Sequence, residues 1–150
     1  MMRHFILLTL SVAVVYGQCP DGWIHHGQSC YRLRFDTETW IDAKVVCEMD
    51  GAYLAEIGDE KENTFIHGLV TDNKGIWIGG TDLSTEGEWI WINSHSDMTY
   101  TKWRPSEPNN MAHDENCLEM DTHGLWNDRT CHYIQKYVCE KTLQNQEIIG

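Results

Sequence analysis

The chain has 150 residues and a formal net charge of −12 at pH 7, from 11 Lys and Arg against 23 Asp and Glu. This excess of acid argues against nucleic acid or an anionic membrane surface as a partner, because both would repel the protein. The length corresponds to one domain with a modest core, and the sequence contains no internal repeat or low-complexity tract.

The first 17 residues have the pattern of a secretory signal peptide. Arg3 supplies a positive start, residues 5–15 are apolar, and Gly17 is a small residue suited to the position before cleavage. The apolar run is shorter than the about 20 residues that a membrane-spanning helix needs, and no second apolar stretch follows. We therefore expect a secreted, extracellular protein that does not insert into membranes.

The cysteine content predicts a disulfide framework. An even number of cysteines in an exported chain implies internal pairing, although six cysteines allow about 15 pairings. A zinc site is the competing interpretation, but no Cys-x-x-Cys pair occurs. Residues 19–30 are rich in turn formers and suit a small hairpin closed by its own disulfide. All six lie after the signal segment: Cys19, Cys30, Cys47, Cys117, Cys131 and Cys139.

Helical patterns dominate the first half of the chain. Residues 31–35 alternate apolar and charged side chains, as in a half-buried strand. A helix is predicted to begin at Thr39, with Asp42 three residues later in a capping-box position. A second helix is expected over residues 59–70, closed by residues 73–75.

The second half predicts short strands around one long polar segment. Helices first and strands later indicate an α+β domain, over residues 18–141, followed by a short polar tail at 142–150. Residues 93–116 form the polar segment, and loops of that length are usually functional or disordered. The expected strands are residues 76–80, 88–92, 117–120 and 137–139.

Oxygen-bearing side chains gather in and after this segment, at Glu107, Asn109, Glu115, Asn127 and Asp128. Solvated loop residues are the commoner explanation for such a cluster. Three features favour a metal instead. Cys117 and Cys131 lie on either side of Asn127 and Asp128, and a disulfide between them would connect the two loop regions. Calcium takes about 6–8 oxygen ligands of mixed type. Pro108 could hold a cis bond and turn both its neighbours toward one point.

At these residues the chain resembles the C-type lectin carbohydrate-recognition domain, over Cys19 to Glu140. Each motif alone is weak evidence for this family, but the order of the motifs together with the matching cysteines is specific to it. The resemblance implies the pairings Cys19–Cys30, Cys47–Cys139 and Cys117–Cys131, and the build is most similar to secreted single-domain lectins of invertebrates such as molluscs. The motifs that carry it are Trp77-Ile78-Gly79, Trp89-Ile90-Trp91, Glu107-Pro108-Asn109 and Trp126-Asn127-Asp128.

The resemblance also implies a principal calcium site that doubles as the sugar site. Its ligands would be Glu107, Asn109, Glu115, Asn127 and Asp128, leaving about two coordination positions for vicinal sugar hydroxyls. The carboxylates would accept from those hydroxyls and the amides would donate to them. The Glu-Pro-Asn triplet goes with equatorial hydroxyls, as in mannose, glucose, N-acetylglucosamine or fucose, whereas galactose-type members carry Gln-Pro-Asp.

A second calcium site matches the family only in part. It would use Asp82, Glu86, Asn110, Glu115 and Asn116, with amides at two positions where well-matched members have Asp. Because charge tunes calcium affinity, this site should be the weaker one.

Other functions remain as alternatives. A protein- or mineral-surface binder of the shell-matrix type would keep the fold and usually lose calcium ligands. A glycosidase using Glu107 and Glu115 is disfavoured, since calcium holds carboxylates ionised whereas catalysis needs one raised pKa. We expect no enzyme, a glycan partner, and at most a non-covalent homo-oligomer because the family pattern uses all six cysteines internally.

Overall fold

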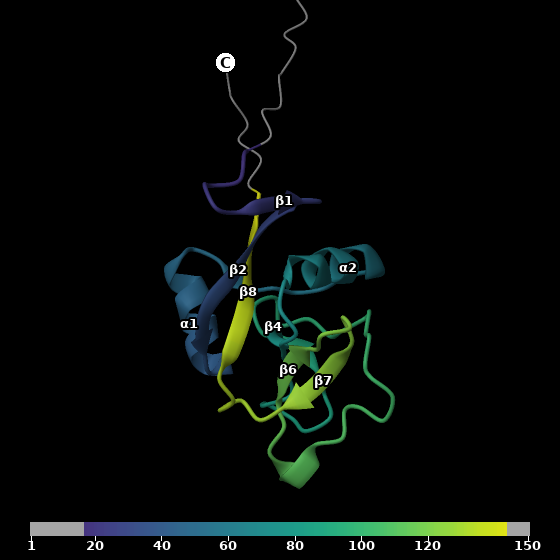
Figure 1. Cartoon of the computed structure of the whole chain (residues 1–150). Coiled ribbons are helices and arrows are strands. Elements are labelled where there is room, and N and C mark those ends of the chain that lie inside the picture. The colour runs from purple at the N-terminus through teal and green to yellow at the C-terminus, as the bar shows by residue number, and fades with distance from the viewer. Residues whose placement is uncertain (1–16, 144–150) are drawn as a thin grey trace, which may run out of the picture.

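The structure, a computed structural model, describes residues 17–143 and has the predicted α+β architecture (Figure 1). Nearly all of the predicted signal peptide and most of the tail lie outside the described residues. The elements are β1 (Ile24–His26), β2 (Ser29–Glu38), α1 (Trp40–Met49), β3 (Tyr53–Leu54), α2 (Glu60–Leu69), β4 (Ile76–Thr81), β5 (Ile90–Trp91), the 3-10 turn η1 (Met111–His113), β6 (Cys117–Met120), β7 (Trp126–Arg129) and β8 (Gln135–Thr142).

One sheet connects the ends of the chain and the site region. Its strand order is β1-β2-β8-β4-β6-β7, with β3 paired to β8 and β5 to β4. β2 and β8 form a long antiparallel pair, and α1 and α2 lie on opposite sides of that pair in Figure 1. β8 extends to Thr142, and the backbone N–H of Leu143 donates to Gln28 O at 2.8 Å, so the domain runs slightly past the expected boundary at residue 141.

Local sequence accounts for both helix starts. Thr39 caps α1 by accepting from the backbone N–H of Asp42 at 3.2 Å, as predicted. Asp59 caps α2 in the same way, through the backbone N–H of Glu62 at 2.9 Å. The predicted bounds of α2 agree with the structure to within its two caps, since Asp59 is the N-cap and Val70 the C-cap. The predicted closure by residues 73–75 is wrong, because Val70 is already extended at φ −81° and ψ 113°.

Gly75 has a different role from closing that helix. A Cβ atom there would lie 2.7 Å from Cδ of Glu119, so glycine lets the start of β4 approach β6 closely. The strand expected over residues 88–92 is reduced to β5, while β3 and β7 are strands that the patterns did not predict.

Several tryptophans lie in the core. Trp40, Trp77, Trp91 and Trp126 are buried, while Trp103 is partly buried against them. Three disulfides, Cys19–Cys30, Cys47–Cys139 and Cys117–Cys131, have the pairing that the resemblance implies. The last one joins the start of β6 to the loop after β7. Within residues 17–143, neither helix is long and apolar enough to cross a membrane.

Candidate functional site

The predicted site lies where the long polar segment folds back onto β7. Between β5 and β6 the chain forms only η1 and two single bridges, one of which joins Trp103 to Trp126. The segment lies at the end of the molecule away from β1 (Figure 1). Because Trp126 is buried and begins β7, the next two residues, Asn127 and Asp128, are held at a fixed place beside this loop.

Asp128 holds the loop through both carboxylate oxygens. It is 1% exposed and accepts from the backbone N–H of Asn109 at 3.1 Å and of Asn110 at 2.6 Å. Hydrogen bonds to an ionised carboxylate are stronger than neutral ones. Asp128 therefore positions the backbone of Asn109 and Asn110.

Glu107 lies next to Asp128 in a half-buried position. The Glu107–Pro108 peptide is cis, in line with the expectation from the sequence. Oε2 of Glu107 is buried and has no hydrogen-bond partner. Burial, and then the neighbouring Asp128, raise the pKa of Glu107 above its usual range. A bare carboxylate oxygen beside a second carboxylate is the environment that a cation stabilises.

Arg104 is the residue of this site that the sequence patterns missed. Its Nη2 donates to Oε1 of Glu107 and to Oδ1 of Asn127, both at 3.2 Å. Its Nη1 lies 3.8 Å from Oδ2 of Asp121. The guanidinium thus joins two candidate ligands that are 20 residues apart in sequence. Its position three residues before Glu107 is the only sequence signal, and it is weak.

Glu115 closes the other side of the loop. Its Oε2 accepts from the backbone N–H of Met111 at 2.9 Å, and its own N–H donates to Oδ1 of Asn110 at 3.1 Å. Asn110 has a left-handed backbone, φ 43° and ψ 52°, which amides tolerate better than most side chains. Burial, and then the charge of Asp128, raise the pKa of Glu115. The five predicted principal ligands thus border one region.

The predicted second site brings Asp82, Glu86 and Asn116 together. With its amide nitrogen toward the carboxylates, Asn116 donates to Oδ1 of Asp82 at 3.1 Å and to Oε2 of Glu86 at 3.3 Å. With its amide oxygen toward them, three oxygens converge, and only a cation would stabilise that arrangement. Burial is the main cause of the raised pKa of Asp82, and the charges of Glu86 and Asp128 add to it.

These side chains fit calcium only as mixed ligand sets. Among residues 17–143, no three His, Cys, Asp or Glu side chains group closely enough to hold a metal by themselves. An ion would need amide and carbonyl oxygens beside the carboxylates, which is the donor set that calcium accepts. The unpartnered oxygen of Glu107 is consistent with that requirement.

A buried amide supports the site from behind. Asn63 of α2 is 2% exposed, accepts from the indole N–H of Trp126 at 2.8 Å, and donates to the carbonyl of Gly124 at 2.9 Å. The helical pattern of the sequence predicts Phe65, Ile66 and Leu69 as the inward residues of α2; Ile66 is fully buried, and the other two are partly buried against the core. Asn63 was not predicted, because a polar residue inside a helix usually faces solvent.

The sequence comparisons identify the family. Residues 36–141 match the model of the lectin C-type domain, so the chain belongs to the C-type lectin domain family. Members of this family bind carbohydrate and are not enzymes. A perlucin-like protein of Mytilus galloprovincialis is 35% identical over 128 residues, which cover 81% of each chain. The low affinity immunoglobulin epsilon Fc receptor of Mus musculus is 35% identical over 140 residues; these cover 93% of this chain but only 42% of the receptor.

Solved structures agree with this assignment. The C-type carbohydrate-recognition domain of cow CD23, determined in the presence of a GlcNAc2Man3 oligosaccharide, superposes with a TM-score of 0.80 and 34% identity, covering 85% of this chain and 98% of that one. A calcium-independent type II antifreeze protein has a TM-score of 0.78 and 30% identity, covering 88% and 98%. The fold is therefore shared by calcium-independent proteins, and calcium use depends on the side chains at the site.

Proposed function

We propose that this chain is a secreted, calcium-dependent lectin that binds mannose-type sugars. The observation that carries the proposal is the buried, unpartnered Oε2 of Glu107 beside the carboxylate of Asp128. Without a cation this pair costs folding free energy, because each charge raises the free energy of ionising the other. A cation bound between them removes that cost, and calcium suits the mixed oxygens nearby.

The ligands of the ion would be Glu107, Asn109, Glu115, Asn127 and Asp128. When bound, calcium would offer about two coordination positions to vicinal sugar hydroxyls. The chain's own side chains then orient the sugar: Glu107 and Glu115 accept the hydroxyl protons, and the amide groups of Asn109 and Asn127 donate to the hydroxyl oxygens.

This pattern of donors and acceptors supports mannose-type specificity. Glu107 precedes the proline and accepts, and Asn109 follows it and donates, an order that suits a pair of equatorial hydroxyls. Residues 110–113, Asn-Met-Ala-His, contain no tryptophan to cover the apolar face of galactose. Glycans rich in mannose, N-acetylglucosamine or fucose are therefore the proposed partners.

Binding to immobilised mannan with calcium, with chelator, and after calcium is restored tests the function. We expect binding only when calcium is present, and inhibition by free mannose. The matched control is Glu107→Ala, which removes one ligand and should bind no mannan under any of the three conditions. Mannose-inhibitable binding that persists in chelator would show that the calcium proposal is wrong.

A second calcium ion at Asp82, Glu86, Asn110, Glu115 and Asn116 is part of the proposal. Without calcium, the amide nitrogen of Asn116 can bridge the two carboxylates itself. Calcium must displace that bridge by turning the amide oxygen inward, so the second ion should bind more weakly than the first.

A further inference from the structure

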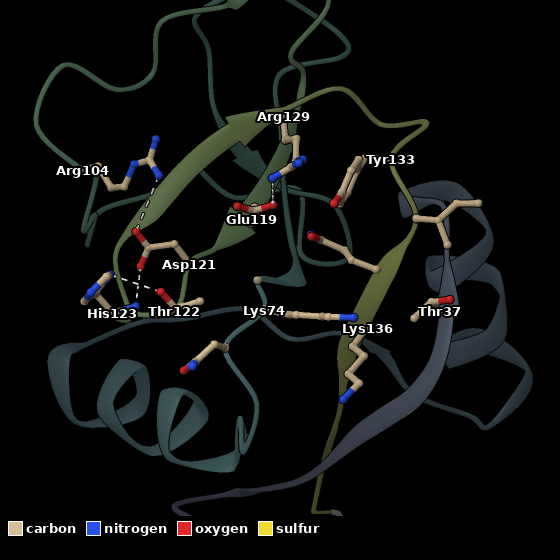
Figure 2. A pocket seen from close by; sticks show the side chains of 14 residues that line it. Thr37, Lys74, Arg104, Glu119, Asp121, Thr122, His123, Arg129, Tyr133 and Lys136 are labelled. Carbon is tan, nitrogen blue, oxygen red and sulfur yellow. Dashed lines mark hydrogen bonds and ion pairs between the residues drawn. The ribbon is translucent and has the colours of Figure 1, made fainter.

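A cavity of about 460 Å³ lies on the other side of Arg104 from the candidate sugar site. It opens between residues 73–75 at the start of β4, one face of β6 and β7, and the start of β8 (Figure 2). None of the predicted calcium ligands lines it. Arg104 does, and its Nη2 donates to Glu107 and Asn127 of the sugar site. The two regions are therefore neighbours that share one side chain.

The cavity has the opposite charge from the protein as a whole. Of the 11 Lys and Arg residues in this acidic chain, four line it: Lys74, Arg104, Arg129 and Lys136. Only two carboxylates, Glu119 and Asp121, are among its lining residues. A concave surface with an excess of cations concentrates anions, and its low-dielectric walls strengthen that effect.

Most of these cations have an internal partner. Nη1 of Arg129 lies 2.7 Å from Oε2 of Glu119, and the guanidinium carbon lies 3.5 Å from the centroid of the Tyr133 ring. Figure 2 shows Arg129 and Glu119 joined by a dashed line, with Tyr133 beside them. Lys136 lies 2.5 Å from Oδ2 of Asp72. Lys136, and then the charge of the nearby Lys74, lower the pKa of the Asp72 carboxyl. Lys74 makes no ion pair within 4 Å among residues 17–143, so its ammonium group can still contact a ligand.

Gln135 adds a donor that the protein does not use. This residue is 6% exposed and lines the cavity, and its amide nitrogen is buried without a hydrogen-bond partner. Burial raises the pKa of the neighbouring Glu119, and Arg129 and then the nearby Gln135 amide lower it in part. The amide nitrogen of Gln135 nevertheless has no acceptor within hydrogen-bond distance. Buried hydrogen-bond donors nearly always have an acceptor, and an oxygen atom of a ligand could accept from the Gln135 amide.

We propose that this cavity binds an oxyanion, and specifically the carboxylate or sulfate group of an acidic glycan. Lys74 supplies an unpaired positive charge and Gln135 an unpaired donor, while the pairing of Glu119 with Arg129 limits its repulsion of an incoming anion. The glycan part rests on the proposed sugar site, since Arg104 connects the two regions. The oxyanion site itself does not depend on calcium.

Nuclear magnetic resonance titrations in chelator test the cavity alone, with sodium sulfate, sodium glucuronate and neutral glucose as probes at constant ionic strength. We expect saturable shifts of the Gln135 side-chain amide and the Lys74 and Gly75 backbone with both anions, and none with glucose. Lys74→Gln should weaken anion binding roughly twofold to fivefold, the range for a partly exposed ion pair. Lys61→Gln, the same change of charge on exposed α2, is the control and should leave binding unchanged.

Gln135→Met removes the donor with little change of size and should also weaken binding; if it does not fold, Lys74→Gln still decides the test. The absence of saturable shifts, or equal weakening by Lys61→Gln, would overturn the oxyanion site. In calcium, a sulfated mannose oligosaccharide should bind more tightly than its unsulfated form, and Lys74→Gln should abolish that advantage. Binding of inorganic sulfate without such an advantage would overturn the glycan assignment. Failure of mannan binding alone would instead contradict the proposed lectin function.

Discussion

Replacement of Asn63 by leucine should destabilise the domain and its site together. Leucine is similar in size to asparagine, and its helix propensity is higher, so neither packing nor propensity should cause a loss of stability. The change therefore isolates the contribution of the two buried hydrogen bonds. The indole N–H of Trp126 would lose its acceptor at 2.8 Å, and the carbonyl of Gly124 would lose its donor at 2.9 Å. Both groups are buried, and water cannot replace Asn63 without entering the core.

The size of the effect follows from those two groups. A buried polar group left without a partner costs about 1–3 kcal/mol, so the loss should be about 2–5 kcal/mol after a small gain from the apolar side chain. For a domain of this size, that corresponds to a fall in melting temperature of roughly 6–20 °C.

Thermal unfolding followed by circular dichroism, in chelator and with the disulfides intact, measures this loss. Thr64→Leu, which places the same side chain at an exposed position of α2, is the control and should change little. Because Trp126 directly precedes Asn127, Asn63→Leu should also weaken mannan binding below the melting temperature. A loss below about 1 kcal/mol, or an equal loss in Thr64→Leu, would refute the assignment of Asn63 as a buried anchor.

Three further predictions concern specificity, the second ion and pH. The double change Glu107→Gln and Asn109→Asp exchanges acceptor and donor, so a glycan array should show lower affinity for mannose and a partial gain for galactose; an unchanged preference would locate specificity elsewhere. Glu86→Gln should remove the weaker of two calcium-binding events in calorimetry while mannan binding persists, and two undiminished events would contradict the second site. Burial raises the pKa of Glu140 in the folded state above its value in the unfolded chain. The folded state therefore binds this proton more tightly, which stabilises the protein fully at a pH below the ordinary carboxyl pKa; this stabilisation is lost as the pH rises through the raised pKa. In urea unfolding, the stability of Glu140→Gln relative to the parent should therefore increase as the pH rises above about 4, and a difference that does not change with pH would contradict this.

The sequence alone was sufficient where the physical cause is local. Thr39 and Asp59 cap their helices because a cap needs only a side-chain oxygen three residues before a free N–H. The even number of cysteines predicted a disulfide framework, but the individual pairings came from the family resemblance. The family resemblance also grouped Glu107, Asn109, Glu115, Asn127 and Asp128, because their order along the chain is characteristic.

The local sequence pattern gave wrong predictions where packing between elements determines where an element ends. The Asn-Lys-Gly stretch at residues 73–75 looked like a helix terminus, yet Gly75 is small because Glu119 packs against it from β6. The end of α2 at Leu69 and the short β5 likewise depend on packing against the sheet, which no window of sequence contains.

Tertiary structure alone decided which polar groups share a buried space. Asn63 and Trp126 are 63 residues apart, Arg104 and Asn127 are 23 apart, and each pair is joined by one hydrogen bond. Lys74, just before β4, and Gln135, at the start of β8, likewise line one cavity. A single sequence shows the donors and acceptors but not the distances between them, and the free energy of a buried hydrogen bond or ion pair depends on those distances and on the exclusion of water.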